Sequence, residues 1–316
     1  MKILRLIATM LLAAVSLQAQ PRIVAYAPNW IGLKTFVPQI DFAKLTHINI
    51  AFENPADADG ALSFQPDNES LIRQAHAHGV KVLVSLGGGS ASEDASRRKA
   101  WFDLISTTKR KGFIAQLAAY VSTHDLDGLD VDLEGPAINR DYAPFIQELS
   151  AALKPKGKFL TAALSKGYGG KDVPDAALAC FDFINVMAYD ATGPWQPDRP
   201  GPHSSLEFAQ GSVDYWLRRG LPKAKLVLGV PFYGWGFGKA FRQQEYRYAD
   251  LIRQYPKAVT DDQVGDTIWH NGIPTMQAKA RLVLDQGLGG VMIWSLNSDA
   301  PGESSLLSVL HGALQK

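Results

Sequence analysis

The sequence predicts an α/β fold, a single (β/α)8 TIM barrel, from its length, from eight short apolar runs and from the helical segments between them. The chain has 316 residues, of which 46% are hydrophobic, so it can bury a large core. Each run is rich in Val, Ile and Leu and is followed by loop residues and an amphipathic segment. Eight such pairs in one chain of this size are typical of a (β/α)8 barrel.

The eight expected strands occupy residues 23–26, 47–52, 81–86, 129–134, 159–164, 183–189, 226–232 and 290–295. The amphipathic helices between them include residues 69–78, 113–122, 143–153, 205–218 and 276–286. A doubly wound open sheet is the alternative, but it would normally begin with a glycine-rich phosphate loop, and Ala27-Pro-Asn-Trp30 is not one. No linker or repeat divides the chain, so we expect residues 20–316 to form one domain. Only Gly234 to Gly289 separate the last two strands, which leaves room for at most a reduced insertion.

The first 19 residues resemble a secretory signal peptide. Lys2 and Arg5 precede an apolar stretch from Leu6 to Leu17, and small residues follow it up to Ala19. This stretch is too short for a membrane anchor, and no later segment supplies one. We therefore expect cleavage after Ala19 and a secreted or periplasmic protein.

Charge and cysteine content exclude several classes of function. Lys and Arg total 32 against 31 Asp and Glu, so nothing indicates nucleic acid or an anionic membrane as a partner. Cys180 is the only cysteine and lies among apolar residues, which predicts a buried structural thiol. The seven histidines show no metal-binding spacing. We expect a monomer without a metal or an organic cofactor.

The most informative segment is Asp127-Gly-Leu-Asp-Val-Asp-Leu-Glu134, which places acids at alternate positions of a predicted strand. Successive strand residues point to opposite faces, so Asp130, Asp132 and Glu134 share one face, whereas Asp127 points away and is interpreted as structural. Neighbouring carboxylates raise each other's pKa, and a shared proton is what general acid catalysis requires. A solvated edge strand or a calcium site is the alternative, but the flanking strands are apolar and buried.

The chemistry of a (β/α)8 barrel lies at the carboxyl ends of its strands. These ends carry acids, a phenol and broad aromatic rings: Asn29, Trp30, Ser85, Gly87, Gly88, Asp132, Glu134, Tyr189, Asp190, Tyr233 and Trp294. Indole and phenol rings stack on sugar rings, and carboxylates act on the glycosidic oxygen. The combination predicts a carbohydrate hydrolase.

Four motifs in the right order resemble those of the chitinases of glycoside hydrolase family 18. The segment from Asp127 to Glu134 matches the DGxDxDxE signature, and Ser85-Leu-Gly-Gly88 matches the SxGG motif of the third strand. Met187-Ala-Tyr-Asp190 is similar to the MxYD motif of strand six, and Gly290 to Trp294 to the eighth strand with its tryptophan. The resemblance extends from Tyr26 to Asp299.

The resemblance implies retaining hydrolysis in which the acetamido oxygen of the substrate attacks the anomeric carbon, an exception to the two-carboxylate scheme. Glu134 would be the general acid and later the base that activates water. Asp132 would turn toward Glu134 and bind the acetamido N–H, with Asp130 as its buried partner at rest. Tyr189 would donate a hydrogen bond to the acetamido oxygen.

The resemblance also implies residues around the bound sugar. Asp190 would contact it, Trp294 would form the floor of the reactive subsite, and Ser85 and Tyr26 would support Asp130. Family members often carry Tyr-Gly-Arg after strand seven, whereas this chain has Tyr233-Gly-Trp235, so Trp235 replaces a sugar-binding arginine and could stack instead. Further candidate platforms are Trp30, Trp195 and Trp269.

Three functions fit these residues. The first is a chitinase acting on chitin or N-acetylglucosamine oligosaccharides with β-1,4 linkages. An endo-β-N-acetylglucosaminidase or a peptidoglycan-trimming enzyme would share the acidic strand, although Met187 favours the chitinase. A chitinase-like lectin on the same barrel is the non-enzyme alternative, but such proteins typically lose the terminal glutamate, and Glu134 is present.

Overall fold

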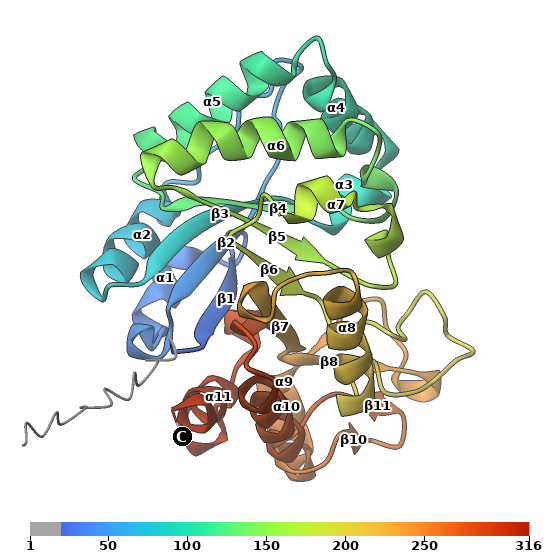
Figure 1. The fold of residues 1–316 in the computed structure, drawn as a ribbon. Coiled ribbons are helices and arrows are strands. Elements are labelled where there is room, and N and C mark those ends of the chain that lie inside the picture. Colours follow the sequence, from blue (N-terminus) through green and yellow to red (C-terminus); the bar gives the residue numbers. More distant parts are fainter. Residues whose placement is uncertain (1–19, 316) are drawn as a thin grey trace, which may run out of the picture.

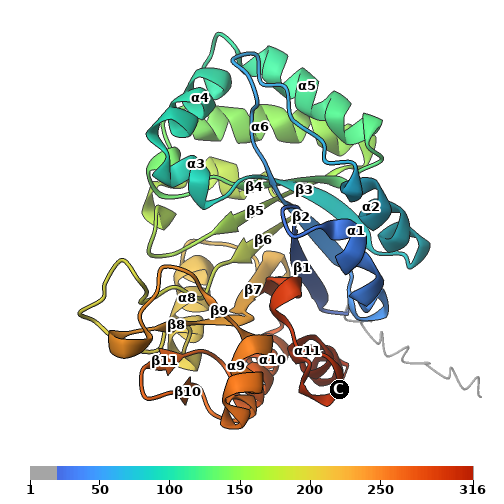
Figure 2. The same cartoon turned by 180° about the vertical axis from the view of Figure 1, so that it is seen from behind.

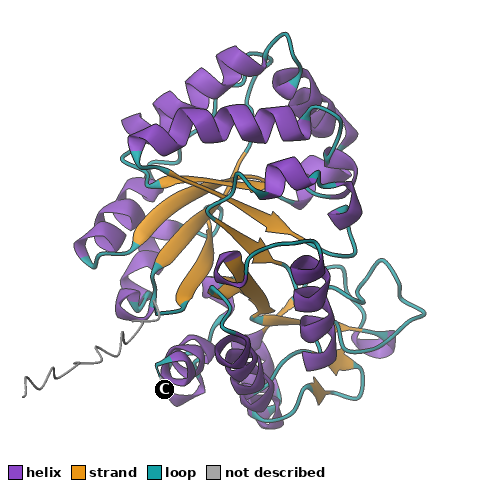
Figure 3. Cartoon of the chain, in the orientation of Figure 1, coloured by secondary structure: helices purple, strands orange, loops and turns teal. Residues whose placement is uncertain are grey.

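The computed structural model describes residues 20–315 and confirms the predicted (β/α)8 barrel. Eight parallel strands close into a barrel in the order β1-β12-β7-β6-β5-β4-β3-β2 (Figure 3). These strands are β1 (Arg22–Pro28), β2 (His47–Glu53), β3 (Lys81–Gly87), β4 (Gly128–Asp132), β5 (Phe159–Leu164), β6 (Phe183–Val186), β7 (Leu226–Pro231) and β12 (Gly290–Trp294).

Helices surround the barrel, and the long helices α5 and α6 lie side by side over one part of it (Figures 1 and 2). The helices are α1 (Leu33–Phe36), α2 (Asp67–Ala77), α3 (Gly89–Glu93), α4 (Ala95–Ile105), α5 (Arg110–Thr123), α6 (Tyr142–Leu153), α7 (Asp175–Leu178), α8 (Leu206–Arg218), α9 (Tyr248–Gln254), α10 (Ile273–Gln286) and α11 (Leu306–Leu314). All five helices expected from the sequence are present, as α2, α5, α6, α8 and α10.

Each strand contributes to two apolar layers, which is why the strands read as nearly continuous apolar runs. Residues that point outward, such as Ile48, Val84 and Leu129, pack against the helices. Residues that point inward, such as Val24 and Phe183, fill the barrel with aromatic and small side chains. The polar inward residues, such as Asp130, therefore lie among buried side chains inside the barrel.

The segment between β7 and β12 forms a small insertion, as the sequence predicts. It contains a four-stranded antiparallel sheet in the order β10-β11-β8-β9, together with α9. Its strands are β8 (Tyr233–Gly236), β9 (Tyr246–Arg247), β10 (Gln263–Val264) and β11 (Ile268–Trp269). The insertion lies beside the long loop that follows β6. Figures 1 and 2 show the insertion in orange and this loop in yellow.

Four predicted strands end earlier in the structure, β7 and β12 by one residue each, β4 by two and β6 by three. Strand β4 ends at Asp132, which pairs with Gly87 of β3. It ends there because Gly135, at a φ of 51°, turns the chain into a 3-10 turn. Strand β6 ends at Val186, where its pairing with both neighbours stops. Glu134 and Tyr189 therefore lie in the loops beyond the strand ends, at the barrel mouth.

The prediction for Cys180 is wrong. The side chain is only half-buried, because it follows α7 in a turn at the protein surface and its Sγ donates to the Ala176 carbonyl at 3.4 Å. The predicted signal peptide, residues 1–19, lies outside the described residues. Among residues 20–315, no helix is long and apolar enough to cross a membrane.

Gly128 begins β4 at a point where β4 and β5 approach each other too closely for a side chain. A Cβ at this position would lie 2.2 Å from the Phe159 carbonyl oxygen. We expect Gly128→Ala to lower the free energy of unfolding by about 1–3 kcal/mol in urea titrations followed by tryptophan fluorescence. Gly112→Ala is the matched control, since nothing lies within 4 Å of its Cβ and alanine favours the helix by about 0.5–1 kcal/mol. Unchanged stability in Gly128→Ala would contradict the observed strand spacing.

Candidate active site

Asp130 is the buried centre of the acidic row. It is fully buried inside the barrel and accepts hydrogen bonds from four side chains on four strands. The donors are Tyr26 Oη at 2.7 Å, Ser85 Oγ at 2.7 Å, Thr161 Oγ1 at 2.5 Å and Asn185 Nδ2 at 3.2 Å. Burial raises the pKa of Asp130, and the hydrogen bonds act in the opposite direction because they favour the ionised form.

Tyr26 and Ser85 thus lie beneath the site, against Asp130. They are 1% and 0% exposed, so they have no surface open to a sugar and act only through Asp130. Register explains the contact with Ser85, because Ser85 is paired directly with Asp130 across β3 and β4. Asp130 is in turn paired with Thr161 across β4 and β5.

Asp132, the next acid of the row, is 5% exposed, and its Oδ1 has no hydrogen-bond partner among the described residues. Burial raises the pKa of Asp132 well above its usual value, and the charges of Glu134 and Asp130 raise it further. A buried carboxyl group without a compensating partner stays protonated. Asp132 therefore offers an unpartnered carboxyl oxygen directly beyond the four donors of Asp130.

Glu134 lies at the barrel mouth, half-buried, directly after β4. Its backbone is fixed by Ser92 Oγ, which donates to the Glu134 carbonyl at 2.7 Å. Burial raises the pKa of its carboxyl to about 7, with further contributions from Asp190 and Glu93. A carboxyl group with a pKa near neutrality can hold a proton at the pH of most cells and still release it.

Tyr189 presents an unused hydroxyl group to the same site. The side chain is 8% exposed, and the one hydrogen bond found for its hydroxyl within residues 20–315 goes to Met292 Sδ at 3.8 Å. A thioether sulfur is a weak acceptor. The hydroxyl can therefore donate to a stronger acceptor that enters the site. Burial raises the pKa of Tyr189 well above its usual range, and the charges of Asp190 and Asp132 raise it further. The hydroxyl group therefore keeps its proton.

Asp190 has an unusual backbone conformation, with a φ of 61°, and two donors and a histidine ring nitrogen meet at one oxygen of its side chain. Tyr233 Oη donates to Oδ1 at 2.6 Å and Trp235 Nε1 at 2.9 Å, while His203 Nδ1 lies 3.4 Å away. Trp235 is only 9% exposed, and its ring packs edge-on against Tyr233 and Trp195. It therefore contributes its indole N–H to the site rather than the face of its ring. Stacking of Trp235 on a sugar, expected from the sequence, is therefore not what this geometry provides.

Aromatic rings line one side of the site in series. Trp294, at the end of β12, stacks on Phe52 at 5.5 Å with 17° between the rings. Phe52 stacks in turn on Trp30 at 6.1 Å and 27°. Trp30 is 63% exposed, so the series runs from the barrel mouth to the protein surface. Glu245 of the insertion accepts a hydrogen bond from Trp294, and burial raises the pKa of Glu245 to about 7.

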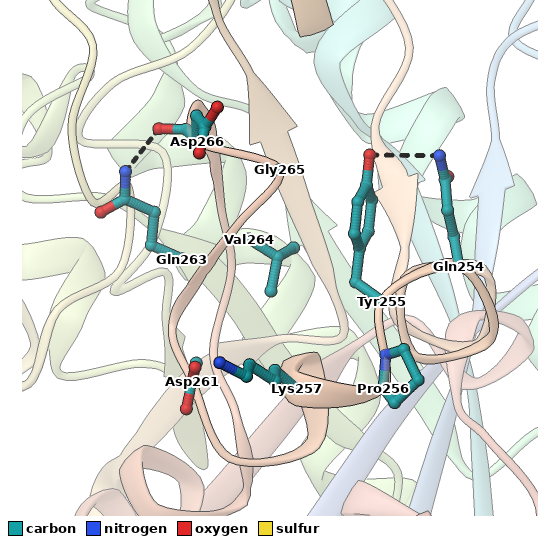
Figure 4. Close-up of a pocket in the computed structure, with 9 residues that line it drawn as sticks. All are labelled: Gln254, Tyr255, Pro256, Lys257, Asp261, Gln263, Val264, Gly265 and Asp266. Carbon is teal, nitrogen blue, oxygen red and sulfur yellow. Dashed lines mark hydrogen bonds between the residues drawn. The ribbon is translucent and has the colours of Figure 1, made fainter.

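A cavity of about 440 Å³ lies next to Glu134, on the side of the barrel mouth opposite these aromatic rings. Its lining comes from the loops after β3, β4, β5 and β6: Gly89, Glu93, Glu134, Ser165, Tyr168, Met187, Tyr189, Asp190 and Trp195. Trp195 is 54% exposed and Tyr168 45% exposed. Cavities of about 490 and 600 Å³ also exist, but none of the row of acids lines them. The former lies within the insertion, between α9 and β10 (Figure 4).

The site thus combines three acids in a row, an unpartnered carboxyl oxygen, a phenol with only a weak acceptor, and flanking aromatic rings. A model of the family described as glycosyl hydrolases family 18 matches residues 22–299. The chain belongs to this family. Within residues 20–315 of this family 18 protein, no group of three or more His, Cys, Asp or Glu residues could hold a metal ion.

Solved and curated relatives share the fold and much of the length. The family 18 chitinase ChiB from the chitin utilization locus of Flavobacterium johnsoniae is 37% identical, with a TM-score of 0.87 over 93% of this chain and 94% of that one. Chitotriosidase-1 of Mus musculus is 26% identical over 88% of this chain and 73% of its own. A chitinase-like effector of Moniliophthora roreri is 29% identical over 67% of this chain, which spans 58% of the effector's length.

Several site residues escaped the sequence analysis of this family 18 protein. Thr161 and Asn185 are polar residues within apolar strand runs, and this pattern in the sequence indicates polar groups inside the barrel. Glu93 ends the short helix α3 and Tyr168 lies in a loop, and only the fold brings them to Glu134. Trp269, proposed as a platform, is half-buried in the insertion and packs edge-on against Phe237.

Lys279 is another unforeseen residue, a buried lysine that fastens the loop after β6 to the insertion. Its Nζ donates to Ser204 O at 2.8 Å, to Ser204 Oγ at 2.6 Å and to Asn271 Oδ1 at 2.7 Å. Ser204 follows His203, which contacts Asp190, so this anchor positions one side of the site. Burial lowers the pKa of Lys279 to about 7, and the charge of Asp262 acts in the opposite direction.

This shift makes the stability of the family 18 protein depend on pH. The unfolded lysine has a pKa of 10.5 and the folded one about 7, so between these values the unfolded chain binds more protons. The free energy of unfolding should therefore rise with pH above 7 by up to about 1.4 kcal/mol per unit. We expect this slope to disappear in Lys279→Met and to persist in Lys257→Met, an exposed control. Equal slopes for the two variants in urea titrations between about pH 7 and 9 would contradict the assignment.

Proposed function

We propose that this family 18 protein is a chitinase that hydrolyses β-1,4-linked N-acetylglucosamine chains with retention of configuration. The nucleophile is the acetamido oxygen of the sugar that is cleaved. The observation that carries the proposal is the pair of unused groups beside Glu134: the acceptor Oδ1 of Asp132 and the hydroxyl donor of Tyr189.

An acetamido group is what such a pair fits. Its N–H would donate to Asp132 Oδ1, and its carbonyl oxygen would accept from the Tyr189 hydroxyl. Both hydrogen bonds use atoms that are otherwise left without a good partner, and a buried polar atom gains most from a partner that the ligand supplies. Held at both ends, the carbonyl oxygen is aimed at the anomeric carbon, which raises its effective concentration there.

Glu134 supplies the proton that the leaving sugar needs. In the first step the acetamido oxygen forms a bond to the anomeric carbon, the glycosidic bond breaks, and the Glu134 proton passes to the departing oxygen. The positive charge that develops on the acetamido group is stabilised by the nearby Asp130 carboxylate and by the hydrogen bond to Asp132. In the second step Glu134 takes a proton from water, which attacks the anomeric carbon and restores the acetamido group.

The raised pKa of Glu134 supports catalysis over binding alone. A lectin on this barrel would need only the aromatic surfaces, whereas a proton donor needs a carboxyl group that remains protonated near neutrality. Burial and two neighbouring acids place the pKa of Glu134 at about 7. The series Trp294, Phe52 and Trp30 provides the apolar surface on which successive sugar rings can lie.

Replacement of Glu134 tests its role as the proton donor. We expect Glu134→Gln to lower kcat on chitin oligosaccharides by about two to four orders of magnitude, because the amide keeps the shape and loses the proton. Affinity for the oligosaccharide, measured by calorimetry, should remain near that of the wild type.

The pH profile adds a second readout. Wild-type kcat/KM should fall as the pH rises through about 7, because the acid form of Glu134 is lost there. Glu303→Gln, which removes an exposed glutamate outside the cavity, is the control and should change neither quantity. Near-normal turnover in Glu134→Gln would exclude the proposed role.

The acetamido mechanism makes its own prediction about substrates and products. Fully deacetylated chitosan oligomers and cello-oligosaccharides should not be cleaved, because they lack the acetamido oxygen. Acetylated chains should release products whose new reducing ends are initially β, as NMR spectra of the first turnovers can show. Initial α products would mean inversion and exclude this mechanism.

A further inference from the structure

The 440 Å³ cavity and the aromatic series lie on opposite sides of the barrel mouth, and Glu134 lines the cavity. Trp294, Phe52 and Trp30 come from β12, β2 and the loop after β1, whereas the cavity is lined from the loops after β3 to β6. Under the proposed function, Trp294 carries the sugar whose bond is cleaved. The cavity then receives the leaving group, the sugar on the far side of the scissile bond.

Tyr168 provides the apolar surface of this cavity. Its ring packs so closely on Gly135 that a Cβ there would lie 2.3 Å from the ring, so glycine is required beneath it. Its backbone N–H donates to Ser165 Oγ at 3.3 Å, which fixes the loop after β5. The ring is 45% exposed and next to Glu134, where a sugar ring can rest on it.

Glu93 gives the same cavity its charge. It ends α3, and the helix is tied to the catalytic strand because Ser92 Oγ donates to the Glu134 carbonyl. Its Oε1 turns back over Gly89, 3.9 Å from where a Cβ of that residue would lie. Within residues 20–315 the Glu93 carboxylate takes part in no ion pair.

Within residues 20–315, the cations Arg97, Arg98 and Lys166 form no ion pair with the carboxyl groups of the cavity. Arg98 donates to the Ser92 carbonyl and Arg97 to Ser90 Oγ at 3.2 Å. Lys166 lies over the ring of Phe208, with its Nζ 4.3 Å from the ring centre. The residues that line the cavity include three carboxyl groups, of which Glu134 is the proton donor, and neither Lys nor Arg. The cavity therefore presents a negative potential to the leaving sugar.

We propose that Glu93 makes the leaving-group subsite selective for glucosamine, the cationic 2-amino sugar, so that the enzyme prefers partly deacetylated chitin cut on the N-acetylated side of a glucosamine unit. The inference rests on the proposed function, because the sugar that is attacked must keep its acetamido group. The leaving sugar stacks on Tyr168, and its ammonium group pairs with the Glu93 carboxylate.

The sugars at the newly formed chain ends test this directly. Cleavage of partly deacetylated chitin converts the leaving-group sugar into a new non-reducing end, which mass spectrometry of the labelled products identifies. At about pH 6 and low salt, the wild type should produce glucosamine at these ends more often than its share of the polymer. Glu93→Gln should lower the ratio of glucosamine to N-acetylglucosamine there by about threefold to fivefold, as expected for one partly exposed ion pair.

The control and the salt dependence separate the outcomes. Glu303→Gln should give the wild-type ratio, and about 1 M salt should bring the wild type close to Glu93→Gln because the charge is screened. Equal ratios in wild type and Glu93→Gln would overturn the inference. The new reducing ends report on the proposed function independently: they should be N-acetylglucosamine in every variant, and glucosamine there would refute the acetamido mechanism instead.

Discussion

A buried carboxylate inside an apolar barrel is the interaction on which the rest of the site depends. An isolated charge in such an interior is strongly unfavourable, so Asp130 is tolerable only because side chains surround it with donors. Tyr26, Ser85, Thr161 and Asn185 come from β1, β3, β5 and β6, and each needs the correct strand register to reach it. The strand order of the barrel therefore supplies the donors that stabilise Asp130, and the need of Asp130 for these donors favours that strand order.

The protonation pattern of the acidic row follows from this arrangement. Asp130 accepts four donors and is best suited to them as an ionised acceptor. Its charge and burial keep Asp132 protonated, with one oxygen left for a ligand. Glu134, farther out, has a pKa of about 7 and can exchange its proton. Three chemically identical groups thus obtain three roles from their depth in the barrel.

The loop after β6 and the insertion form the side of the site that contains Asp190. A second buried network, centred on Lys279, holds these two segments together. Lys279 joins Ser204 to Asn271, and His203 joins the same loop to Asp190. Trp235 donates to Asp190 through its indole N–H. In this chain the residue that replaces the expected arginine keeps a donor in the site while removing a cation from it.

Short apolar runs predicted the strands and the barrel, and alternation within one run predicted the common face of Asp130, Asp132 and Glu134, because local pattern determines these features. The runs placed the ends of β4 and β6 two or three residues late, since pairing with neighbours, and not composition, ends a strand. Contacts across the barrel, such as those of Thr161 and Asn185 with Asp130, require the register of distant strands. Glu93 belongs to a five-residue helix and Tyr168 to a loop, so only the folded chain shows that they share a cavity.

The protonation states of the three acids are the most direct test of this account. Carbon-13 NMR of labelled Asp and Glu carboxyl groups can follow them between about pH 4 and 9, with signals assigned by loss in Asp130→Asn, Asp132→Asn and Glu134→Gln. We expect Asp132 to stay protonated at neutral pH and Glu134 to titrate near 7. Ionisation of both groups near pH 4, the ordinary value for exposed carboxyls, would contradict the account.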